Sequence, residues 1–338
     1  MHELRKDPIT GNWVVVLDYA LAPGDYPRGE EAPLDEAGCL LCPGREAETG
    51  PETAAVRPEG SGAGSTGWRV RAVRSPRPIL VPEGELGRKG VGLYDRMNAA
   101  GVSEIIVESP EHGRSPEDLG AGQMRDVLEV YKARVAEMER DPKIRYVLIR
   151  KSSGRRAGAA YGHPHSTVLG TPVIPTYIKH ELDGAKSYFA YKERCIYCDI
   201  LDEEIRQGAR VIAATGGFVA FCPFAPRFAF EFWVMPRGHS CAFQDCGGGE
   251  TAELGELMGD VLRKMRSALA EPSYTLALHT APNRMPRRGH WHTLGDDFHW
   301  HIEVAPRLPG LPGVESGSRE LTVLATSPED AAKFIREA

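Results

Sequence analysis

Two histidines separated by one residue form the stretch of this sequence that is best suited to chemistry. His163 and His165 follow a glycine-rich approach and precede an apolar run, which predicts a strand that starts where a loop ends. Residues two apart in a strand share a face, so we expect both imidazoles to point the same way. Pro164 between them cannot donate to a sheet ladder, which predicts an edge or a break there. This spacing suits one imidazole held by a partner and another left free to react.

Two Cys-x-x-Cys pairs are the second feature of the sequence that could bind a metal or react. Such pairs commonly supply two of the four ligands of structural zinc. Each pair is followed along the chain by a turn histidine and then by His-x-His. A single pair could equally be two buried thiols, but the ordered repetition argues against chance. The sequence therefore predicts two zinc sites per chain, one made of Cys39, Cys42, His112 and His163, the other of Cys195, Cys198, His239 and His299.

The remaining cysteines and histidines are interpreted as core or surface residues: Cys222, Cys241, Cys246, His2, His180 and His279. His290 and His292 are interpreted in the same way, although both are close enough in sequence to the second set to be rival ligands. The sequence also leaves open whether the second metal is zinc or iron. Disulfides are not expected, because the chain lacks the features of an exported protein.

Composition narrows the class of protein. The chain has 338 residues, 41% apolar and 26% charged, enough for one large domain or two moderate ones. A net charge of -6 and a pI near 6.0 argue against nucleic acid as the main partner. The Cys-x-x-Cys pairs are also roughly 150 residues apart, against about 15–20 in common four-cysteine sites. No apolar run has signal-peptide or membrane-spanning length, so we expect a cytoplasmic protein without membrane contact.

Apolar patterning predicts the same order of elements twice. Strands are predicted at residues 13–17, 68–73, 102–109, 145–150, 211–214, 217–222, 228–235 and 274–279, with helices from about 115 to 138 and 251 to 270. Residues 22–67, rich in Pro, Gly and Glu, are predicted to be loop. Each half reads Cys-x-x-Cys, strands, turn histidine, helix, strand and His-x-His. A period near half the chain predicts a duplicated unit rather than a solenoid.

Taken in order, six stretches make the chain resemble the galactose-1-phosphate uridylyltransferase family of the histidine triad superfamily, which includes ADP-glucose phosphorylase-like proteins. They are residues 5–14, 39–42, 108–112, 163–165, 195–198 and 299–308. The resemblance implies an α+β fold of two histidine-triad-like halves, each an antiparallel sheet with packed helices, here assigned to residues 1–180 and 181–338. It also implies a homodimer and a ping-pong transfer in which His165 carries the nucleoside monophosphate.

The chemistry of imidazole agrees with that role. A neutral imidazole is nucleophilic and leaves readily from phosphorus, so it can divide one phosphoryl exchange into two steps. His163, held on zinc, would fix the strand that carries His165. The turn at residues 152–156 offers donors for phosphoryl oxygens, and a solvated basic loop is the less favoured alternative. The residues expected to contact substrate are Arg71, Ser75, Ser152, Gly154, Arg155, Ser166, Thr167 and His301.

The chain departs from the family pattern at positions that are expected to bind the phosphate groups and the base. Ser152 replaces an asparagine, Ala160 a serine and Thr167 a glutamine. Ser75 stands where a base-binding asparagine is expected, and residues 18–23 replace an arginine-proline segment. These differences do not affect the expected fold. Because these positions differ, the sequence does not identify the base, the sugar or the acceptor. It therefore does not decide whether the protein acts in galactose metabolism.

We therefore expect a zinc-containing nucleotidyltransferase whose substrates are a nucleotide sugar and a sugar phosphate or inorganic phosphate. A rival of the same class is a nucleotide-sugar or dinucleotide phosphorylase. The rival from another class is a catalytically inactive, zinc-stapled nucleotide-binding protein, for which the altered phosphate-contact positions are the argument.

Overall fold

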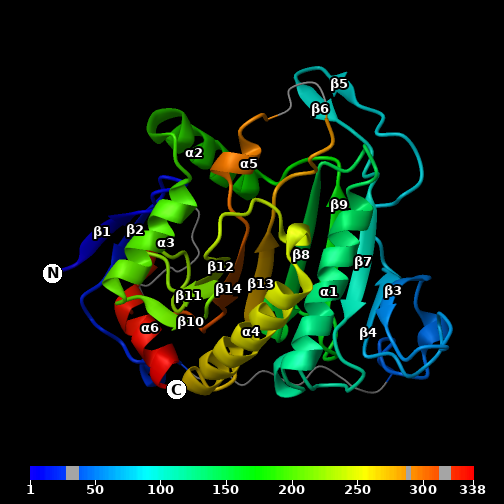
Figure 1. Ribbon diagram of the computed structural model, residues 1–338, viewed down its shortest axis with the longest axis horizontal. Coiled ribbons are helices and arrows are strands. Elements are labelled where there is room, and N and C mark those ends of the chain that lie inside the picture. Colours follow the sequence, from blue (N-terminus) through cyan, green and yellow to red (C-terminus); the bar gives the residue numbers. More distant parts are fainter. Residues whose placement is uncertain (28–37, 287–290, 312–320) are drawn as a thin grey trace.

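A ten-stranded antiparallel sheet runs through the middle of the molecule (Figure 1). The computed structural model describes residues 1–27, 38–286, 291–311 and 321–338. From one edge to the other, the strands are β10 (Val211–Ala214), β11 (Phe218–Phe221), β12 (Phe232–Pro236), β14 (His301–Pro306), β13 (Tyr274–His279), β8 (Tyr146–Ser153), β9 (His165–Thr171), β7 (Val102–Val107), β4 (Val70–Arg74) and β3 (Glu52–Val56).

The strand order repeats about the centre of this sheet. The first half reads β3-β4-β7-β9-β8 and the second reads β10-β11-β12-β14-β13, so every strand has a counterpart with equivalent neighbours. The halves meet where β8 pairs with β13, which leaves neither strand with an open edge. The predicted α+β fold with duplicated halves is confirmed, and the two sheets join into one. The expected boundary at residue 180 falls inside helix α2 (Thr176–Lys192), and the division into two domains stays a prediction.

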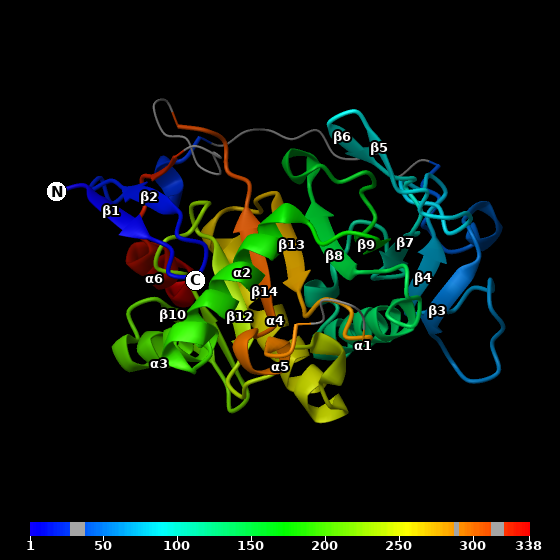
Figure 2. The same ribbon diagram turned by 90° about the horizontal axis from the view of Figure 1, so that it is seen from above.

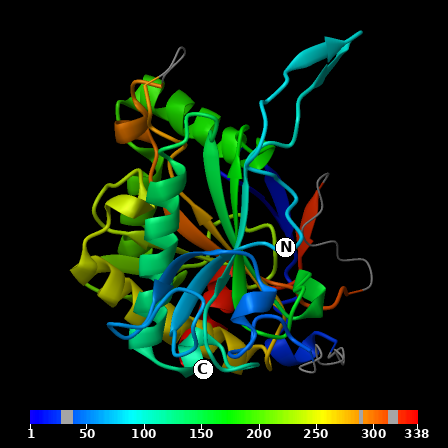
Figure 3. The ribbon, with the colours of Figure 1, turned by 90° about the vertical axis from the view of Figure 1, so that its right-hand side faces the viewer.

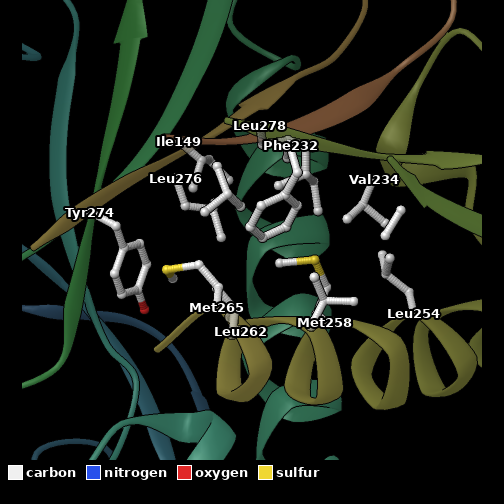
Figure 4. Packing of buried hydrophobic residues seen from close by; sticks show 14 of the residues in the cluster. Ile149, Phe232, Val234, Leu254, Met258, Leu262, Met265, Tyr274, Leu276 and Leu278 are labelled. Atoms are coloured by element: carbon white, nitrogen blue, oxygen red, sulfur yellow. The ribbon is translucent and has the colours of Figure 1, made fainter. Parts of the chain in front are cut away.

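Helices α1 (Ala121–Met138) and α4 (Gly248–Ala268) cover one face of the sheet, as Figures 1 and 2 show. In Figure 4 the apolar side chains of α4 point at those of the strands. These residues are Leu254, Met258, Leu262 and Met265 on the helix, facing Phe232, Val234, Leu276 and Leu278. Each such side chain contributes about 1.5–3 kcal/mol on burial, so this layer is a principal source of stability.

The two long helices also meet each other, one from each half of the repeat. At Gly255 of α4 a Cβ atom would lie 2.9 Å from the backbone nitrogen of Arg125 in α1 and 3.4 Å from the carbonyl oxygen of Ala121. Only glycine allows the backbones to approach so closely. One turn further on, a Cβ at Gly259 would meet Met124 at an ordinary 3.7 Å.

The opposite face of the second half is covered by α2 and α3 (Ile196–Gln207). Side chains of a strand alternate between faces, and in β12 Phe232 and Val234 pack with α4, whereas Trp233 and Met235 pack with α2 and α3. On the equivalent face of the first half, β4 and β7 pack with the loop of Cys39, and no α-helix residue belongs to this cluster among the described residues. One half is therefore closed on both faces and the other is not.

Smaller elements complete the fold. β1 (Glu3–Lys6), β2 (Trp13–Val16) and β15 (Thr322–Leu324) form a separate sheet beside α6 (Pro328–Glu337). The hairpin of β5 (Lys89–Val91) and β6 (Tyr94–Arg96) projects from the body, as Figure 3 shows in cyan, and α5 (Leu294–Asp297) is a single turn. None of the helices that the structure describes is both long and apolar enough to cross a membrane.

Several sequence expectations are corrected here. The segment 22–67, predicted to be loop, contains β3, which pairs with β4. The first helix begins at Ala121 rather than near residue 115, because Gly120 has a φ of 94° and separates it from a 3₁₀ turn at Pro116–Asp118. The strand predicted from residue 228 begins at Phe232. Helices α2 and α3 were not predicted, although Ile178, Leu182 and Ala185 have helical spacing.

Candidate active site and metal centres

All four predicted ligands of the first metal set lie together, with their ligand atoms within 4.8 Å of one another. The Sγ atom of Cys42 is 3.4 Å from Nδ1 of His112 and 3.5 Å from Nδ1 of His163. A tetrahedral zinc ion with ordinary Zn–S and Zn–N bonds would separate sulfur and nitrogen by about 3.5 Å. The geometry therefore fits zinc held by Cys39, Cys42, His112 and His163.

The other ring nitrogen of His163 is also fixed. Its Nε2 donates a hydrogen bond of 2.7 Å to the carbonyl oxygen of Ser109, which follows β7. Burial lowers the pKa of His163 to about 4, so its imidazole is neutral and has a lone pair available on Nδ1. Hydrogen bonding of the second nitrogen is the usual way in which a protein orients a metal-binding histidine.

The second predicted set also lies within 4.8 Å. Sγ of Cys198 is 3.3 Å from Nδ1 of His239 and 3.6 Å from Nδ1 of His299, while Nε2 of His239 donates to the carbonyl oxygen of Gly295 (2.9 Å). A hydrogen bond from Cys195, helped by both histidines, holds the pKa of Cys198 well below its usual value. The thiolate is the metal-binding form of cysteine. These four residues therefore have the same fit to zinc as the first set.

The rival ligands do not join this second set. His292 is not among the residues that the structure brings together there, and His290 lies outside the described residues. Both cysteines belong to the start of α3, where Cys195 is the residue before the first turn and Cys198 lies within it. A helix start thus positions the pair that sequence analysis had placed on no element.

His165 begins strand β9 and has one ring nitrogen engaged. Its Nδ1 donates to the carbonyl oxygen of His163 (2.8 Å), while Nε2 has no hydrogen-bond partner in the part of the chain that the structure describes. Burial lowers the pKa of His165, although Glu108 and the hydrogen bond oppose this. The ring is neutral, the proton is on Nδ1, and the lone pair is on Nε2.

Behind this strand end lies a buried polar group that sequence analysis missed. The carboxylate of Glu108 accepts hydrogen bonds from Tyr131 of α1 (2.7 Å) and Ser166 of β9, and it pairs with Lys151 of β8. Burial alone would raise the pKa of Glu108, but the Lys151 ammonium and the hydrogen bonds lower it overall. One carboxylate therefore links β8, β9 and α1 behind His165.

Two predicted substrate contacts lie on the same face of the sheet as His165. The register sets Arg150 opposite Thr167. Thr167 is two residues from His165, and Ser152 is two residues from Arg150, so both lie on the His165 face of the sheet. Both are half-exposed. Ser166 lies on the other face, fully buried against Tyr131 and Glu108. The structure thus brings Ser152 and Thr167, but not Ser166, beside His165.

The glycine-rich turn is held close to the second half of the chain. Gly154 has a φ of 81°, and a Cβ there would lie 1.9 Å from the hydroxyl of Ser273, so the turn requires glycine. Arg155 follows in a short 3₁₀ turn and is exposed. The groups of this turn that can donate to substrate are therefore its backbone N–H groups, the hydroxyls of Ser152 and Ser153, and its exposed arginine side chains.

The two remaining predicted contacts of the first half lie on β4 or just after it. Arg71 is buried in the row of His165, two strands away. It donates to Glu52 (3.1 Å) and Thr49 (2.8 Å), and one of its terminal nitrogens has no hydrogen-bond partner among the described residues. Ser75 lies four residues further along and accepts a hydrogen bond from the backbone of Arg77. The structure brings Arg71 nearer to His165 than Ser75.

His301 repeats the geometry of His165 in a closed environment. Its Nδ1 donates to the carbonyl oxygen of His299 (3.1 Å), as His165 does to His163. The ring is fully buried, stacks on Trp233 at 4.9 Å, and has Nε2 3.8 Å from Glu303. The rows of the sheet put β14 three strand spacings, about 14 Å, from β9. The structure therefore does not bring His301 together with His165.

Helix α2 covers the buried group around His301. Glu181 of α2 accepts a hydrogen bond from His279 (3.0 Å), whose ring lies 4.9 Å from that of His301. Glu181, His279, His301 and Glu303 have ligand-type atoms within 4.8 Å of one another, and Arg227 forms an ion pair with Glu303. His279, interpreted as an ordinary core residue, is thus part of a buried charged group that the pattern of the second half did not indicate.

The chain is similar to known proteins along its whole length. Residues 80–175 match the family described as galactose-1-phosphate uridyl transferase, N-terminal domain. The chain is 30% identical to ADP-glucose phosphorylase of Arabidopsis thaliana over 340 residues, 99% of this chain and 92% of that one. It is 23% identical to galactose-1-phosphate uridylyltransferase of Thermotoga maritima over 344 residues, 100% and 98% of the two chains. The solved structure of the Arabidopsis phosphorylase with bound ADP-glucose superimposes with a TM-score of 0.81 at 28% identity, covering 100% of this chain and 99% of that one.

Proposed function

Because the chain belongs to the galactose-1-phosphate uridylyltransferase family and is therefore a nucleotidyltransferase, we propose that it acts through a covalent nucleotidyl-His165. Its substrates are a nucleotide sugar as donor and a sugar phosphate or inorganic phosphate as acceptor. The observation that carries the proposal is the hydrogen bond of 2.8 Å from Nδ1 of His165 to the carbonyl oxygen of His163. That bond holds the proton on Nδ1 and leaves the nucleophilic lone pair on Nε2.

The reaction has two displacements at the same phosphorus. In the first, Nε2 attacks the α-phosphorus of the donor, the N–P bond forms, and the sugar phosphate leaves with the electron pair of the broken P–O bond. In the second, an oxygen of the acceptor attacks that phosphorus and the N–P bond breaks, which returns the electron pair to Nε2. The carbonyl of His163 stabilises the charge that the imidazole gains in the intermediate, because it already accepts the Nδ1 proton.

We infer that zinc occupies both Cys/His sets and that its role is structural. Cys39, Cys42, His112 and His163 would hold one ion, and Cys195, Cys198, His239 and His299 the other. Four protein ligands leave no position for substrate, as in structural zinc sites generally. In the first set the ion would link the loop of Cys39 to the residue whose carbonyl orients His165, so metal binding and catalytic geometry are coupled.

A donor panel without acceptor tests the mechanism. Incubated with UDP-, ADP-, GDP- or dTDP-sugars, the protein should gain the mass of one nucleoside monophosphate on a peptide containing His165 and lose it in acid. Adding phosphate should then release a nucleoside diphosphate, and adding a hexose 1-phosphate a nucleotide sugar, which separates phosphorylase from transferase activity. Labelling that survives His165→Asn would contradict the mechanism. Absence of label with every donor, while nucleotides still bind, would identify an inactive zinc-stapled binding protein.

Two further expectations accompany this function. The homodimer that the family resemblance implies stays a prediction, to be measured by light scattering of the purified protein. The cytoplasmic location expected from the sequence stays a prediction as well, and cell fractionation would test it.

A further inference from the structure

Two arginines on the sheet face that carries His165 have no carboxylate at ion-pair distance among the residues described here. Arg150 belongs to β8 and is exposed. Arg307 follows β14 and is half-buried, with a hydrogen bond of 2.9 Å to the hydroxyl of Thr275 and its guanidinium 3.8 Å from the centre of the Phe228 ring. Neither contact neutralises its charge.

Among the described residues, the arginines that are fully buried, which are Arg71, Arg134 and Arg210, all have a carboxylate partner, and so has the partly buried Arg227. Arg134 forms an ion pair with Glu104, Arg210 with Glu204 and Arg227 with Glu303. Burial lowers the pKa of Arg307, and the charges of Arg227 and Arg150 lower it further, while Glu231 opposes them. A half-buried cation beside other cations is stabilised when an anion binds there.

The register of the sheet places the two arginines near each other. β8 and β13 set Arg150 opposite Ala277, and Ser152 opposite Thr275. Opposed residues share a face, as do residues two apart, so Arg150 and Thr275 are diagonal neighbours on one face, roughly 7–8 Å apart. Since Thr275 holds the guanidinium of Arg307, the two cations flank the same small area of sheet.

The same register brings this area to His165. β8 and β9 set Arg150 opposite Thr167 and Lys151 opposite Ser166, so His165 comes next to the position of Ser152. Thr167, Ser152 and Thr275 have short side chains and are half-exposed, so solvent reaches this part of the sheet between His165 and Arg307. Strands β9 and β13 are two strand spacings, about 10 Å, apart, and β8 lies between them. The long side chain of Arg150 on β8 can therefore reach toward either neighbour.

We propose that Arg150 and Arg307 form an oxyanion site for the phosphate group that is exchanged with the nucleotide. In the forward direction this group belongs to inorganic phosphate or a sugar phosphate, whose oxygen attacks the phosphorus of nucleotidyl-His165 as the N–P bond breaks. In the reverse direction it is the phosphate that leaves. Guanidinium groups bind phosphate oxygens through paired hydrogen bonds, which fixes the position of the attacking oxygen. The assignment of the ligand rests on the proposed function.

Substitution of each arginine by glutamine removes the charge and keeps most of the volume. Arg150→Gln should raise the KM for the acceptor about tenfold or more, since charge-assisted hydrogen bonds to phosphate are lost. Arg307→Gln should do the same, and Arg150→Lys should restore part of the loss. Arg237→Gln, an exposed arginine after β12 in the other half, is the matched control and should behave as the unaltered protein. Inorganic phosphate and a hexose 1-phosphate are assayed separately, so the response shows which of them the site serves.

A direct measurement of phosphate binding tests the oxyanion site independently of the covalent mechanism at His165. Calorimetric titration with inorganic phosphate should show binding that weakens in Arg150→Gln and Arg307→Gln but not in Arg237→Gln, whether or not His165 becomes labelled. Affinity for a nucleoside monophosphate should change less than twofold in all three. If the acceptor KM and phosphate binding of Arg150→Gln both equal those of the control, the site does not exist. If His165 is never labelled but phosphate binding follows the predicted order, the proposed mechanism fails and the oxyanion site stands.

Discussion

The ammonium of Lys151 forms a buried ion pair with the carboxylate of Glu108, directly behind the strand end that carries His165. Glu108 precedes Ser109, whose carbonyl accepts from His163, and its carboxylate also accepts from Ser166, which follows His165. The pair therefore lies at the junction of His163, His165 and the turn at Ser152.

Glu108→Gln should destabilise the protein by about 3–5 kcal/mol at pH 7, because it leaves the buried ammonium of Lys151 without a counter-charge. Urea denaturation measures this loss. Asp183→Asn is the matched control, since Asp183 forms an exposed pair with Lys179 and its loss should cost less than about 0.5 kcal/mol. Equal effects of the two substitutions would contradict the role assigned to Glu108.

Lowering the pH should remove the stability that the Glu108–Lys151 ion pair contributes. The pKa of Glu108 is lower in the fold than its usual value of 4.5, so the stability that it supplies is complete above pH 4.5 and disappears as the pH falls through the lowered value. Stability measured by denaturation below pH 4.5 should fall more steeply in the unaltered protein than in Glu108→Gln, which has already lost this contribution. Parallel curves would show that Glu108 has an unshifted pKa.

The purified protein should contain about two zinc ions per chain, because each Cys/His set offers four ligands at tetrahedral spacing. Serine at both Cys39 and Cys42 should remove about one ion and abolish labelling of His165, since metal binding there supports the strand that carries it. Serine at both Cys195 and Cys198 should also remove about one. Elemental analysis checks both, with Cys241→Ser as a control that keeps the full content. Unchanged zinc in either double variant would exclude that set.

His301→Asn should leave labelling intact and cost stability, the reverse of what His165→Asn does. His301 is fully buried against Trp233 under α2, so truncating it leaves polar groups and space uncompensated, at a cost of about 2 kcal/mol or more. Label stoichiometry and urea denaturation are measured on the same samples, and His180→Asn, exposed on α2, serves as the control for both. Loss of label in His301→Asn with normal stability would mean that the second position takes part in the reaction.

Gly255→Ala and Gly259→Ala in helix α4 should change stability in opposite directions. Alanine is the better helix former by about 1 kcal/mol, and at Gly259 its methyl group meets only Met124 at 3.7 Å, so that substitution should stabilise. At Gly255 the methyl group would clash with the backbone of α1 at 2.9 Å, so the helices must separate and the protein should unfold at lower urea. Stabilisation by both changes would show that α1 and α4 are not in close contact at this point.

Much of the site follows from local patterns in the chain. The types and spacing of Cys39, Cys42, His112 and His163 indicate a metal set, because the ligand chemistry of zinc admits few alternatives. The alternation of a strand places Thr167 with His165, since residues two apart share a face. Repetition of the same order of motifs likewise indicated two equivalent halves, and the sheet has that symmetry.

Tertiary structure decided what distinguishes the halves. His165 and His301 make the same hydrogen bond to a carbonyl two residues earlier, yet α2 covers only His301 and supplies Glu181 to its neighbour His279. Likewise, Arg150 meets the area of Thr275 and Arg307 only because β8 and β13 pair across the two halves. Periodicity along a chain determines which face a residue occupies, but the coverage of that face depends on contacts between segments distant in sequence, which no local spacing encodes.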